Sequence, residues 1–421
     1  MSVVEALFQE SQLLRFITAG SVDDGKSTLI GRLLHDSKSI FEDQLLAAGR
    51  TTRRRGIEGI DLSLLTDGLI AEREQGITID VAYRYFATPK RKFILADSPG
   101  HEQYTRNMVT AASKAELAII LIDARKGVLT QTRRHSYIAK LMGVRHIVVA
   151  INKMDLVGYS EEVFARIKTD FATFAQDAGL RDVITIPISA LYGDMVVERG
   201  DKLDWYRGEP LLIALETAAV DDDLAEREFR FPVQGVTRPH NSEHHDFRGY
   251  MGRVESGEIK VGDEVTVLPS GFSSRIKKIH TYDGDLPRAR AHQSVTLLLE
   301  NQLDISRGDA IVRGAPKVAK EFDASVCWLD TAPLQTGRKY VFKQTTKAAK
   351  AIVQRVHHAL DINTLSRDES ASTLNLNEIG RVAIKVQNPL VFDAYEDNRA
   401  TGAFILMDEA SNHTVAAGMI L

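Results

Sequence analysis

The sequence predicts an α/β P-loop domain with a mostly parallel sheet, followed by two antiparallel β-barrel domains. Between about residues 14 and 217, apolar runs such as "KFILAD", "LAIILIDA" and "HIVVAIN" alternate with helical patterns, and each run ends in a polar loop. Near-continuous apolar strands separated by amphipathic helices are typical of a parallel sheet covered on both faces. After the acidic stretch "VDDDLAEREFRF", two-residue alternation with glycine turns indicates β-barrels.

These changes of pattern set the expected domain boundaries. The α/β domain is expected at residues 1–217, a linker at 218–230, and the two barrels at 231–318 and 319–421. In "GRVESGEIKVGDEVTVLPSG", Gly262-Asp263 separates two expected strands. A chain of 421 residues is too long for one ordinary core, which agrees with several domains.

The composition is that of a folded soluble protein, with 44% hydrophobic and 26% charged residues. Lys and Arg number 53 against 57 Asp and Glu, so there is no global electrostatic case for binding nucleic acid or an anionic membrane. The single cysteine, Cys327, rules out an internal disulfide and fits a reducing cytosol. The start "MSVVEALFQESQLLRF" has no signal pattern, and the apolar runs are far shorter than a bilayer span. We therefore expect a cytoplasmic protein without nucleic-acid or membrane partners.

The stretch "GSVDDGKST" fits the phosphate-loop pattern G-x-x-x-x-G-K-[ST], between an expected strand and an expected helix. Glycines let backbone amides close around phosphates, and the helix N-terminus adds a positive dipole. Lys26 is expected to bridge the outer phosphates, and the Ser27 hydroxyl is expected to bind Mg²⁺. The expected phosphate-binding residues are Gly20, Ser21, Val22, Asp23, Asp24, Gly25, Lys26, Ser27 and Thr28.

A second motif, "FILADSPGH", ends an apolar strand with an acidic residue. Asp97 is well placed there to hold Mg²⁺ through water, and the Gly100 amide can reach a γ-phosphate. The residues that follow Asp97 and join the expected site are Ser98, Pro99, Gly100 and His101. An ordinary strand-to-loop turn is the alternative interpretation.

The residues that follow two further strands indicate which nucleotide base is bound. "VVAINKMD" places Asn152, Lys153, Met154 and Asp155 after a strand. A carboxylate at Asp155 can accept hydrogen bonds from guanine N1–H and N2–H₂, which adenine does not offer. "PISAL" supplies Ser189, Ala190 and Leu191, whose backbone amides are expected to meet guanine O6. In this order and spacing, the motifs select GTP.

The ordered set GSVDDGKS, GITI, DSPGH, NKMD and SAL resembles the GTPase domain of the translation-factor superfamily, which includes elongation factor Tu. The resemblance implies that Thr78 is the switch threonine, which ligates Mg²⁺ together with Ser27 and Asp97. It also implies that His101 orients the attacking water, between an apolar gate of Val22 and Ile77, so that His101, Lys26 and Thr78 form the catalytic set. A β-branched strand residue at Thr78 and a plain loop histidine at His101 are the alternatives.

Longer blocks resemble one branch of this superfamily, the large subunits of bacterial sulfate adenylyltransferases. Asp24 stands where elongation factors have histidine, and "DSPGHEQYTRNMVTAAS", "FRGYMGRVESGEIKVGDEV" and "NRATGAFILMD" also match. Ser98 departs from the family's usual threonine. The resemblance implies GTP hydrolysis that drives ATP and sulfate to adenosine 5′-phosphosulfate and pyrophosphate, a step of sulfate assimilation towards cysteine.

The resemblance places the ATP-binding adenylyl-transfer site on a separate small catalytic subunit, as part of a hetero-oligomer. In agreement, the sequence has no second phosphate loop, no Ser-Gly-Gly-x-[Asp/Ser] loop and no His-x-Gly-His motif. Some relatives carry a fused adenylylsulfate kinase, and this sequence ends at "GMIL" without one. The rival functions are a translation factor that delivers aminoacyl-tRNA and a plain molecular switch.

Four other features of the sequence allow more than one interpretation or indicate core packing. "RTTRRRG" at residues 50–56 is either a solvated loop or a contact with the partner subunit. "PHNSEHHDF" holds His240, His244 and His245 without cysteine or helical metal spacing, which favours a surface loop over a metal site. "EEVFARIKTDFATFAQDAGL" predicts a packed helix, and Cys327 beside Trp328 is expected in a core.

Overall fold

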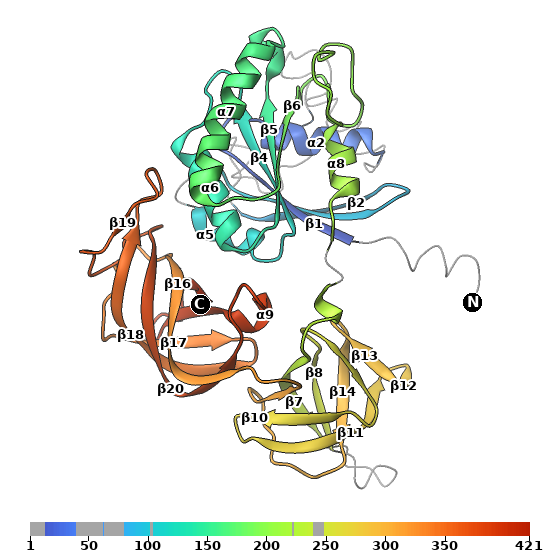
Figure 1. Ribbon diagram of the computed structural model, residues 1–421, viewed down its shortest axis with the longest axis vertical. Helices are drawn as coiled ribbons and strands as arrows, with labels where there is room; N and C mark the ends of the chain where they lie inside the picture. The colour runs from blue at the N-terminus through green and yellow to red at the C-terminus, as the bar shows by residue number, and fades with distance from the viewer. Residues whose placement is uncertain (1–12, 39–61, 63–79, 102–103, 221–222, 239–247) are drawn as a thin grey trace. The chain divides into compact units, whose positions relative to one another are not determined.

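The computed structural model describes residues 13–38, 62, 80–101, 104–220, 223–238 and 248–421. The chain divides into two compact units, residues 1–220 with 362–365 and residues 221–361 with 366–421 (Figure 1). Among the described residues, no helix is both long and apolar enough to cross a membrane.

The first unit is built on one sheet, which has six strands within the described residues, in the order β2-β3-β1-β4-β5-β6. Its strands are β1 (Leu13–Ala19), β2 (Ala82–Ala87), β3 (Lys92–Asp97), β4 (Leu117–Asp123), β5 (His146–Asn152) and β6 (Val183–Pro187). All neighbouring pairs are parallel except β2 with β3. Every residue of the central strand β4 is buried, as expected for a strand covered on both faces.

Helices cover both faces of this sheet. They are α2 (Lys26–Asp36), α5 (Thr105–Ala112), α6 (Thr130–Leu141), α7 (Glu161–Ala178) and α8 (Leu211–Thr217), with a 3₁₀ turn, η3 (Met154–Val157). Figure 1 shows α6 and α7 on one side of the sheet and α2 and α8 on the other. The packed helix expected at α7 is confirmed, because Phe164, Ile167, Phe171 and Phe174 are all buried. It begins at the Ser160 cap, whose hydroxyl accepts from the Val163 amide at 3.3 Å.

The second unit begins with an antiparallel barrel. Six of its described strands close into a ring in the order β7-β8-β14-β11-β10-β15, because β15 pairs with β7 and β10 with β11. The elements are the 3₁₀ turn η4 (Asp223–Ala225), β7 (Arg230–Thr237), β8 (Gly249–Arg253), β9 (Glu258–Lys260), β10 (Glu264–Leu268), β11 (Phe272–Thr281), β12 (Gly284–Leu286), β13 (Arg288–Arg290), β14 (Ser294–Leu299) and β15 (Ala310–Val312). Gly262-Asp263 separates β9 from β10 as expected, but β9 pairs with β13 and not with β10.

A second barrel follows with the ring order β17-β21-β22-β16-β20-β18 among the described strands, closed by pairing of β17 with β18. Its elements are β16 (Lys317–Trp328), β17 (Lys339–Gln344), β18 (Lys347–Leu360), β19 (Arg367–Asp368), β20 (Ile379–Phe392), α9 (Arg399–Gly402), β21 (Ala403–Asp408) and β22 (Thr414–Ile420). Strand β16 runs across the residue 318/319 boundary. Cys327 and Trp328 are buried in this barrel, so their expected place in a core is confirmed. The predicted fold class, a P-loop α/β domain followed by two antiparallel barrels, is also confirmed.

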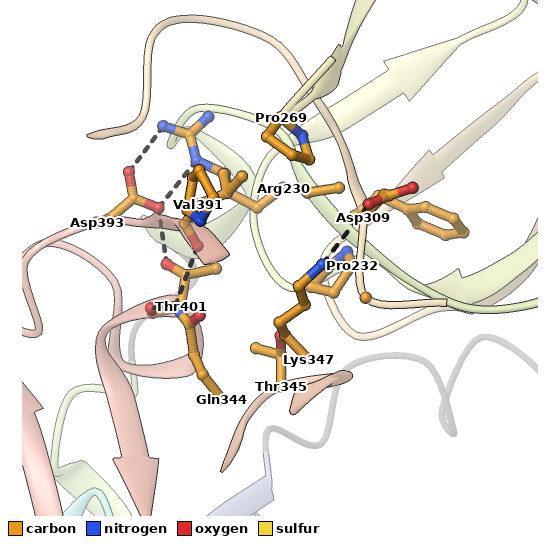
Figure 2. Close-up of a pocket in the computed structure, with 14 residues that line it drawn as sticks. Arg230, Pro232, Pro269, Asp309, Gln344, Thr345, Lys347, Val391, Asp393 and Thr401 are labelled. Atoms are coloured by element: carbon orange, nitrogen blue, oxygen red, sulfur yellow. Dashed lines mark hydrogen bonds and ion pairs between the residues drawn. The ribbon is translucent and has the colours of Figure 1, made fainter. Parts of the chain in front are cut away.

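A buried ion pair joins the two barrels within the second unit (Figure 2). Arg230, on β7, donates from Nε and Nη2 to the carboxylate of Asp393 at 2.9 and 2.8 Å. Its remaining donor, Nη1, bonds the carbonyls of Phe229 and Arg313. With every nitrogen of the guanidinium bonded to protein, Arg230 serves to hold the barrels together and not to bind a ligand in the small pocket beside it.

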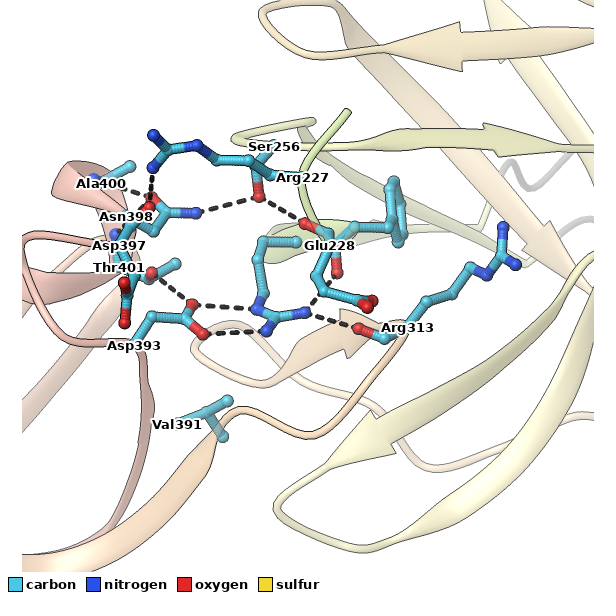
Figure 3. A network of polar contacts seen from close by, with 12 residues as sticks. Arg227, Glu228, Ser256, Arg313, Val391, Asp393, Asp397, Asn398, Ala400 and Thr401 are labelled. Carbon is cyan, nitrogen blue, oxygen red and sulfur yellow. Dashed lines mark hydrogen bonds and ion pairs between the residues drawn. The ribbon is translucent and has the colours of Figure 1, made fainter. Parts of the chain in front are cut away.

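Helix α9 extends this polar junction (Figure 3). The Thr401 hydroxyl donates to Asp393 Oδ2 at 2.7 Å, and Asn398 Nδ2 donates to Ser256 Oγ at 2.9 Å. Ser256 in turn donates to the Glu228 carbonyl at 2.6 Å. The contacts join β7 and the loop before β9 in one barrel to α9 and the end of β20 in the other.

Candidate functional site

The phosphate loop connects β1 to α2 at the carboxyl edge of the parallel sheet. Gly25, the residue before α2, has φ 93°, and a Cβ there would lie 2.5 Å from Asn152 Nδ2. Glycine is therefore needed twice at this position, for its backbone conformation and for its lack of a side chain. The backbone turns that the motif requires are present.

Lys26 is the first residue of α2 and is buried. Its ammonium group donates to the carbonyls of Gly20 and Ser21, each at 2.9 Å. Burial lowers the pKa of Lys26, and the charges of Asp97, Asp24 and Asp23 oppose that shift. The lysine therefore lies inside the loop with acidic neighbours around it.

The other loop residues divide into outward and inward side chains. Asp23 is exposed with φ 66°, whereas Asp24 is buried and its Oδ2 accepts from the Ser21 amide at 2.6 Å. Val22, Ser27 and Thr28 are partly exposed.

The "DSPGH" motif follows β3 and lies against the phosphate loop. Thr18 Oγ1 donates to Asp97 Oδ1 at 3.2 Å, and the Ser98 hydroxyl donates to the Thr18 carbonyl at 2.6 Å. A Cβ at Gly100 would lie 2.5 Å from Lys26 Nζ, so this backbone closely approaches the loop. Through its hydroxyl, Ser98 joins this segment to the backbone of β1 at Thr18. Pro99 is buried beside it, and His101 is exposed, with its ring 6.0 Å from that of Tyr104.

Asn152, the last residue of β5, bridges the phosphate loop and the "SAL" segment. Its Nδ2 donates to the Asp24 carbonyl at 2.8 Å, and its Oδ1 accepts from the Ala190 amide at 3.0 Å. The backbone amides of Ser189, Ala190 and Leu191 are expected to meet guanine O6, and in this structure the Ala190 amide donates to Asn152.

The side chain expected to read the base is oriented by the same segment. Asp155 Oδ1 accepts from the Ser189 hydroxyl at 2.7 Å. Met154 is fully buried and packs in the core, whereas Leu191 is exposed beside the site. Arg32 of α2 donates to the carbonyls of Ala190 and Leu191, which ties this segment to the helix of the phosphate loop.

A charged cluster at the end of β4, which the sequence motifs do not predict, also lies at this edge of the sheet. Asp123 pairs in register with Asn152, and its buried carboxylate accepts from Lys153 Nζ at 3.0 Å and from Arg125 at 3.0 and 2.6 Å. Burial raises the pKa of Asp123, but these hydrogen bonds outweigh burial and hold the pKa well below its usual value. Lys153 also donates to the Asp23 carbonyl. The sequence feature that could have pointed to this cluster is Asp123 itself, an acidic residue at the end of an otherwise apolar strand.

The donors around the phosphate loop fit Mg²⁺. The Ser27 hydroxyl and the Asp97 carboxylate are hard oxygen donors of the kind that this ion prefers, and they would hold it beside the phosphate loop. The described part of the chain holds no group of three or more His, Cys, Asp or Glu residues placed so that they could hold a metal ion by themselves, and a site shared with phosphates needs none.

Several expected residues lie outside the described part of the chain. These are Thr78 and Ile77 of the first switch, the basic stretch at residues 50–56, and His240, His244 and His245.

A glycine-rich phosphate loop, a strand-end aspartate and an Asn-Lys-x-Asp segment on one edge of a parallel sheet define a P-loop guanine-nucleotide-binding protein. The chain matches the elongation factor Tu GTP binding domain over residues 11–221 and elongation factor Tu domain 2 over 250–312. Residues 321–421 match the GTP-eEF1A C-terminal domain-like family.

The chain is also similar to curated proteins over almost all of its length. It is 55% identical to sulfate adenylyltransferase subunit 1 of Aliarcobacter butzleri, over 98% of this chain and 88% of the relative. It is 55% identical to subunit 1 of Chromobacterium violaceum over 98% and 87%. It is 54% identical to the bifunctional enzyme CysN/CysC of Mycobacterium tuberculosis over 97% and 67%. This chain belongs to the sulfate adenylyltransferase subunit 1 family, and its first domain is a GTPase domain of the elongation factor Tu type.

Proposed function

We propose that this chain is the GTPase subunit of a sulfate adenylyltransferase. In this role GTP hydrolysis drives the formation of adenosine 5′-phosphosulfate from ATP and sulfate on a separate small catalytic subunit. The observation that carries the proposal is the 55% identity to subunit 1 relatives, which extends through the nucleotide site and both barrels. The curated relatives above are named as sulfate adenylyltransferase subunit 1 and CysN/CysC, which does not favour the alternative of a translation factor that delivers aminoacyl-tRNA.

The nucleotide residues take the following roles in this proposal. Backbone amides from Gly20 to Thr28 surround the phosphates, and Lys26 moves its ammonium from two loop carbonyls to the outer phosphates. Asp155, held by Ser189 at 2.7 Å, accepts from guanine N1–H and N2–H₂. The base and the phosphates are therefore bound by separate strand ends of one sheet.

We assign Mg²⁺ to the Ser27 hydroxyl and the Asp97 carboxylate, with Thr78 as the switch ligand. When bound, the ion neutralises charge on the β- and γ-phosphates. Thr18 holds Asp97 by a 3.2 Å hydrogen bond, which keeps one carboxylate oxygen turned towards β1.

His101 is assigned to orient the attacking water. It is exposed and directly follows Gly100, whose backbone lies against the phosphate loop. An imidazole nitrogen can accept a hydrogen bond from a water molecule, which suits a residue that orients water. Val22 is the described member of the apolar gate, and Ile77 is the other.

The sulfate–phosphate anhydride is unfavourable to form, so its synthesis must be driven. Loops that are ordered by a γ-phosphate and released after hydrolysis can bias the active site of a bound partner. In this proposal residues 1–217 form the GTP-binding domain, a linker follows from residue 218, and the two barrels begin with β7 at Arg230 and β16 at Lys317. The partner is the small catalytic subunit, and the complex works in the cytoplasm.

Reconstitution tests the proposal. The purified chain is mixed with the small catalytic subunit, ATP, sulfate and a pyrophosphatase, and adenosine 5′-phosphosulfate is measured with and without GTP. We expect product formation to depend on GTP. Equal product without GTP would overturn the energy-coupling role.

The Asp155→Asn variant tests whether Asp155 recognises the guanine base. An asparagine amide offers a donor where the carboxylate accepted, so it opposes guanine and suits the O2 carbonyl of xanthine. The variant is expected to support product formation with XTP and to lose it with GTP. Unchanged dependence on GTP would remove Asp155 from base recognition.

A further inference from the structure

The carboxylate of Asp24 is an unusual feature of the phosphate loop, because it is turned inward beneath the loop. The residue is 1% exposed. A Cβ placed on Gly20 would lie 3.2 Å from Asp24 Oδ2 and 3.0 Å from the Leu121 carbonyl. The carboxylate therefore lies between the start of the loop and the end of β4.

The two carboxylate oxygens of Asp24 differ in their partners. Oδ2 accepts from the Ser21 amide at 2.6 Å, and the Asp24 amide donates back to the Ser21 carbonyl at 3.3 Å. Oδ1 is buried and has no hydrogen-bond partner among the described residues. A buried carboxylate normally has its lone pairs satisfied, so one oxygen without a partner indicates a role other than stability.

Charged groups face Asp24 from three segments. Lys26 lies on α2, Asp123 ends β4, and Lys126 follows β4. Burial raises the pKa of Asp24 to about 6, against the opposing charge of Lys26. At pH 7.5 the carboxylate is therefore ionised, and it places a negative charge beneath the loop that must receive polyphosphate.

We propose that the Asp24 carboxylate is an internal anion of the phosphate loop, which competes with nucleotide phosphates for Lys26 and thereby speeds nucleotide release. It also holds the Ser21 amide, which is then not offered to a phosphate. Asp24 is thus a positioning residue that acts through Lys26 and the loop backbone. This inference rests on the guanine-nucleotide binding proposed above.

Asp24→Asn tests the inference, because asparagine keeps the shape and can still accept from the Ser21 amide while the charge is removed. Release of a fluorescent GDP analogue from the full chain is followed by stopped flow. At an effective dielectric of about 20, a unit charge about 12 Å from a second unit charge changes an affinity by about tenfold. We expect release to slow about tenfold.

The sign of the change separates the proposal from a merely structural role. Damage to the loop would speed release and weaken binding, whereas loss of an internal anion slows release. Asp170→Asn, on the exposed face of α7, makes the same charge change and is expected to leave release within twofold of wild type. Release from Asp24→Asn at or above the wild-type rate would overturn the inference.

A pH profile of the wild-type chain gives a second readout that needs no variant to fold. Release is expected to slow as pH falls through about 6, because protonation neutralises Asp24. The terminal phosphate of GDP also titrates near pH 6, so the ratio of wild-type to Asp24→Asn rates is the measurement. His135, which faces Lys26, stays neutral over this range because burial lowers its pKa to about 3.

The rate ratio is expected to be about tenfold at pH 7.5 and to fall to about threefold at pH 5.5, where roughly a quarter of Asp24 is still ionised. A ratio that is constant with pH would contradict the inference. If the wild-type chain binds no guanine nucleotide at all, the proposed function fails. If it binds and the two rates are equal, only the role of Asp24 fails.

Discussion

Replacing Gly25 by alanine puts a methyl group where the phosphate loop meets Asn152. The backbone at Gly25 has φ 93°, and the added Cβ would lie 2.5 Å from Asn152 Nδ2. Asn152 Nδ2 donates to the Asp24 carbonyl, and Asn152 Oδ1 accepts from the Ala190 amide. Both hydrogen bonds must lengthen or break if Asn152 moves away from the methyl group.

The expected loss follows from these contacts. A left-handed backbone costs an L-residue about 1–2 kcal/mol. Two hydrogen bonds with net contributions of about 0.5–1.5 kcal/mol each add a further 1–3 kcal/mol. The sum of about 2–5 kcal/mol corresponds to a fall in GTP affinity of roughly 30-fold to 4,000-fold, if the bound state needs the original loop.

Gly127→Ala is the matched control. Gly127 also has a left-handed backbone, with φ 71°, but a Cβ there meets nothing within 4 Å. It therefore isolates the backbone contribution in the same unit of the chain. GTP dissociation constants are measured by calorimetry and unfolding free energies by urea titration, for both variants and the wild type.

The two variants are expected to separate. Gly127→Ala should lose about 1–2 kcal/mol of stability and leave GTP affinity within threefold of wild type. Gly25→Ala should lose GTP affinity by at least 30-fold. If Gly25→Ala binds GTP as well as the control does, the close approach of Asn152 does not shape the loop.

Three other predictions follow from the site and the barrels. His101→Ala should slow single-turnover GTP hydrolysis by about 10²-fold or more with GTP affinity within threefold, and fast turnover would remove His101 from the water-orienting role. Asp393→Asn should lower the free energy of unfolding, measured in urea, by about 3 kcal/mol, because Arg230 stays buried without its charged partner. An unchanged free energy of unfolding would show that the ion pair does not stabilise the junction of the barrels. Asp123→Asn should weaken GTP binding by about 1.5–3 kcal/mol in calorimetry because Lys153 loses a charged partner, and unchanged affinity would contradict that support.

The parallel strands of the first domain were predictable because each is a continuous apolar run with a polar end. β4, buried at every residue, is the clearest case. Strand β2 was not foreseen as the antiparallel edge of the sheet, since its alternating residues include exposed Tyr83 and Tyr85. Edge strands lack the double burial that makes a strand visible in sequence.

Strand pairing in the barrels was beyond local reasoning. The turn at Gly262-Asp263 suggested two neighbouring strands, yet β9 pairs with β13, which follows β10, β11 and β12 in the chain, and β10 pairs with β11 and β15. Arg230 lay in a stretch interpreted as an acidic linker, and it is a buried residue of β7. Both outcomes depend on contacts between residues distant in the chain.

The candidate site residues were named by motif, but their mutual contacts were not. Nothing local in the sequence says that Asp24 turns inward while Asp23 turns outward. The cluster of Asp123 with Lys153 depends on the register of β4 with β5, which only the folded sheet defines. Motifs therefore gave the identities of the residues, and the sheet gave their partners.

The position of Asn152 has a consequence for how ligand fragments bind. The Asn152 side chain contacts both the phosphate loop, at Asp24, and the Ser189–Leu191 loop proposed to lie beside the base, at Ala190. A ligand fragment that orders one of these loops also orders the other. The second fragment therefore loses less conformational entropy of the protein when it binds. Tripolyphosphate is expected to increase the affinity for guanosine, and guanosine to increase that for tripolyphosphate by the same factor.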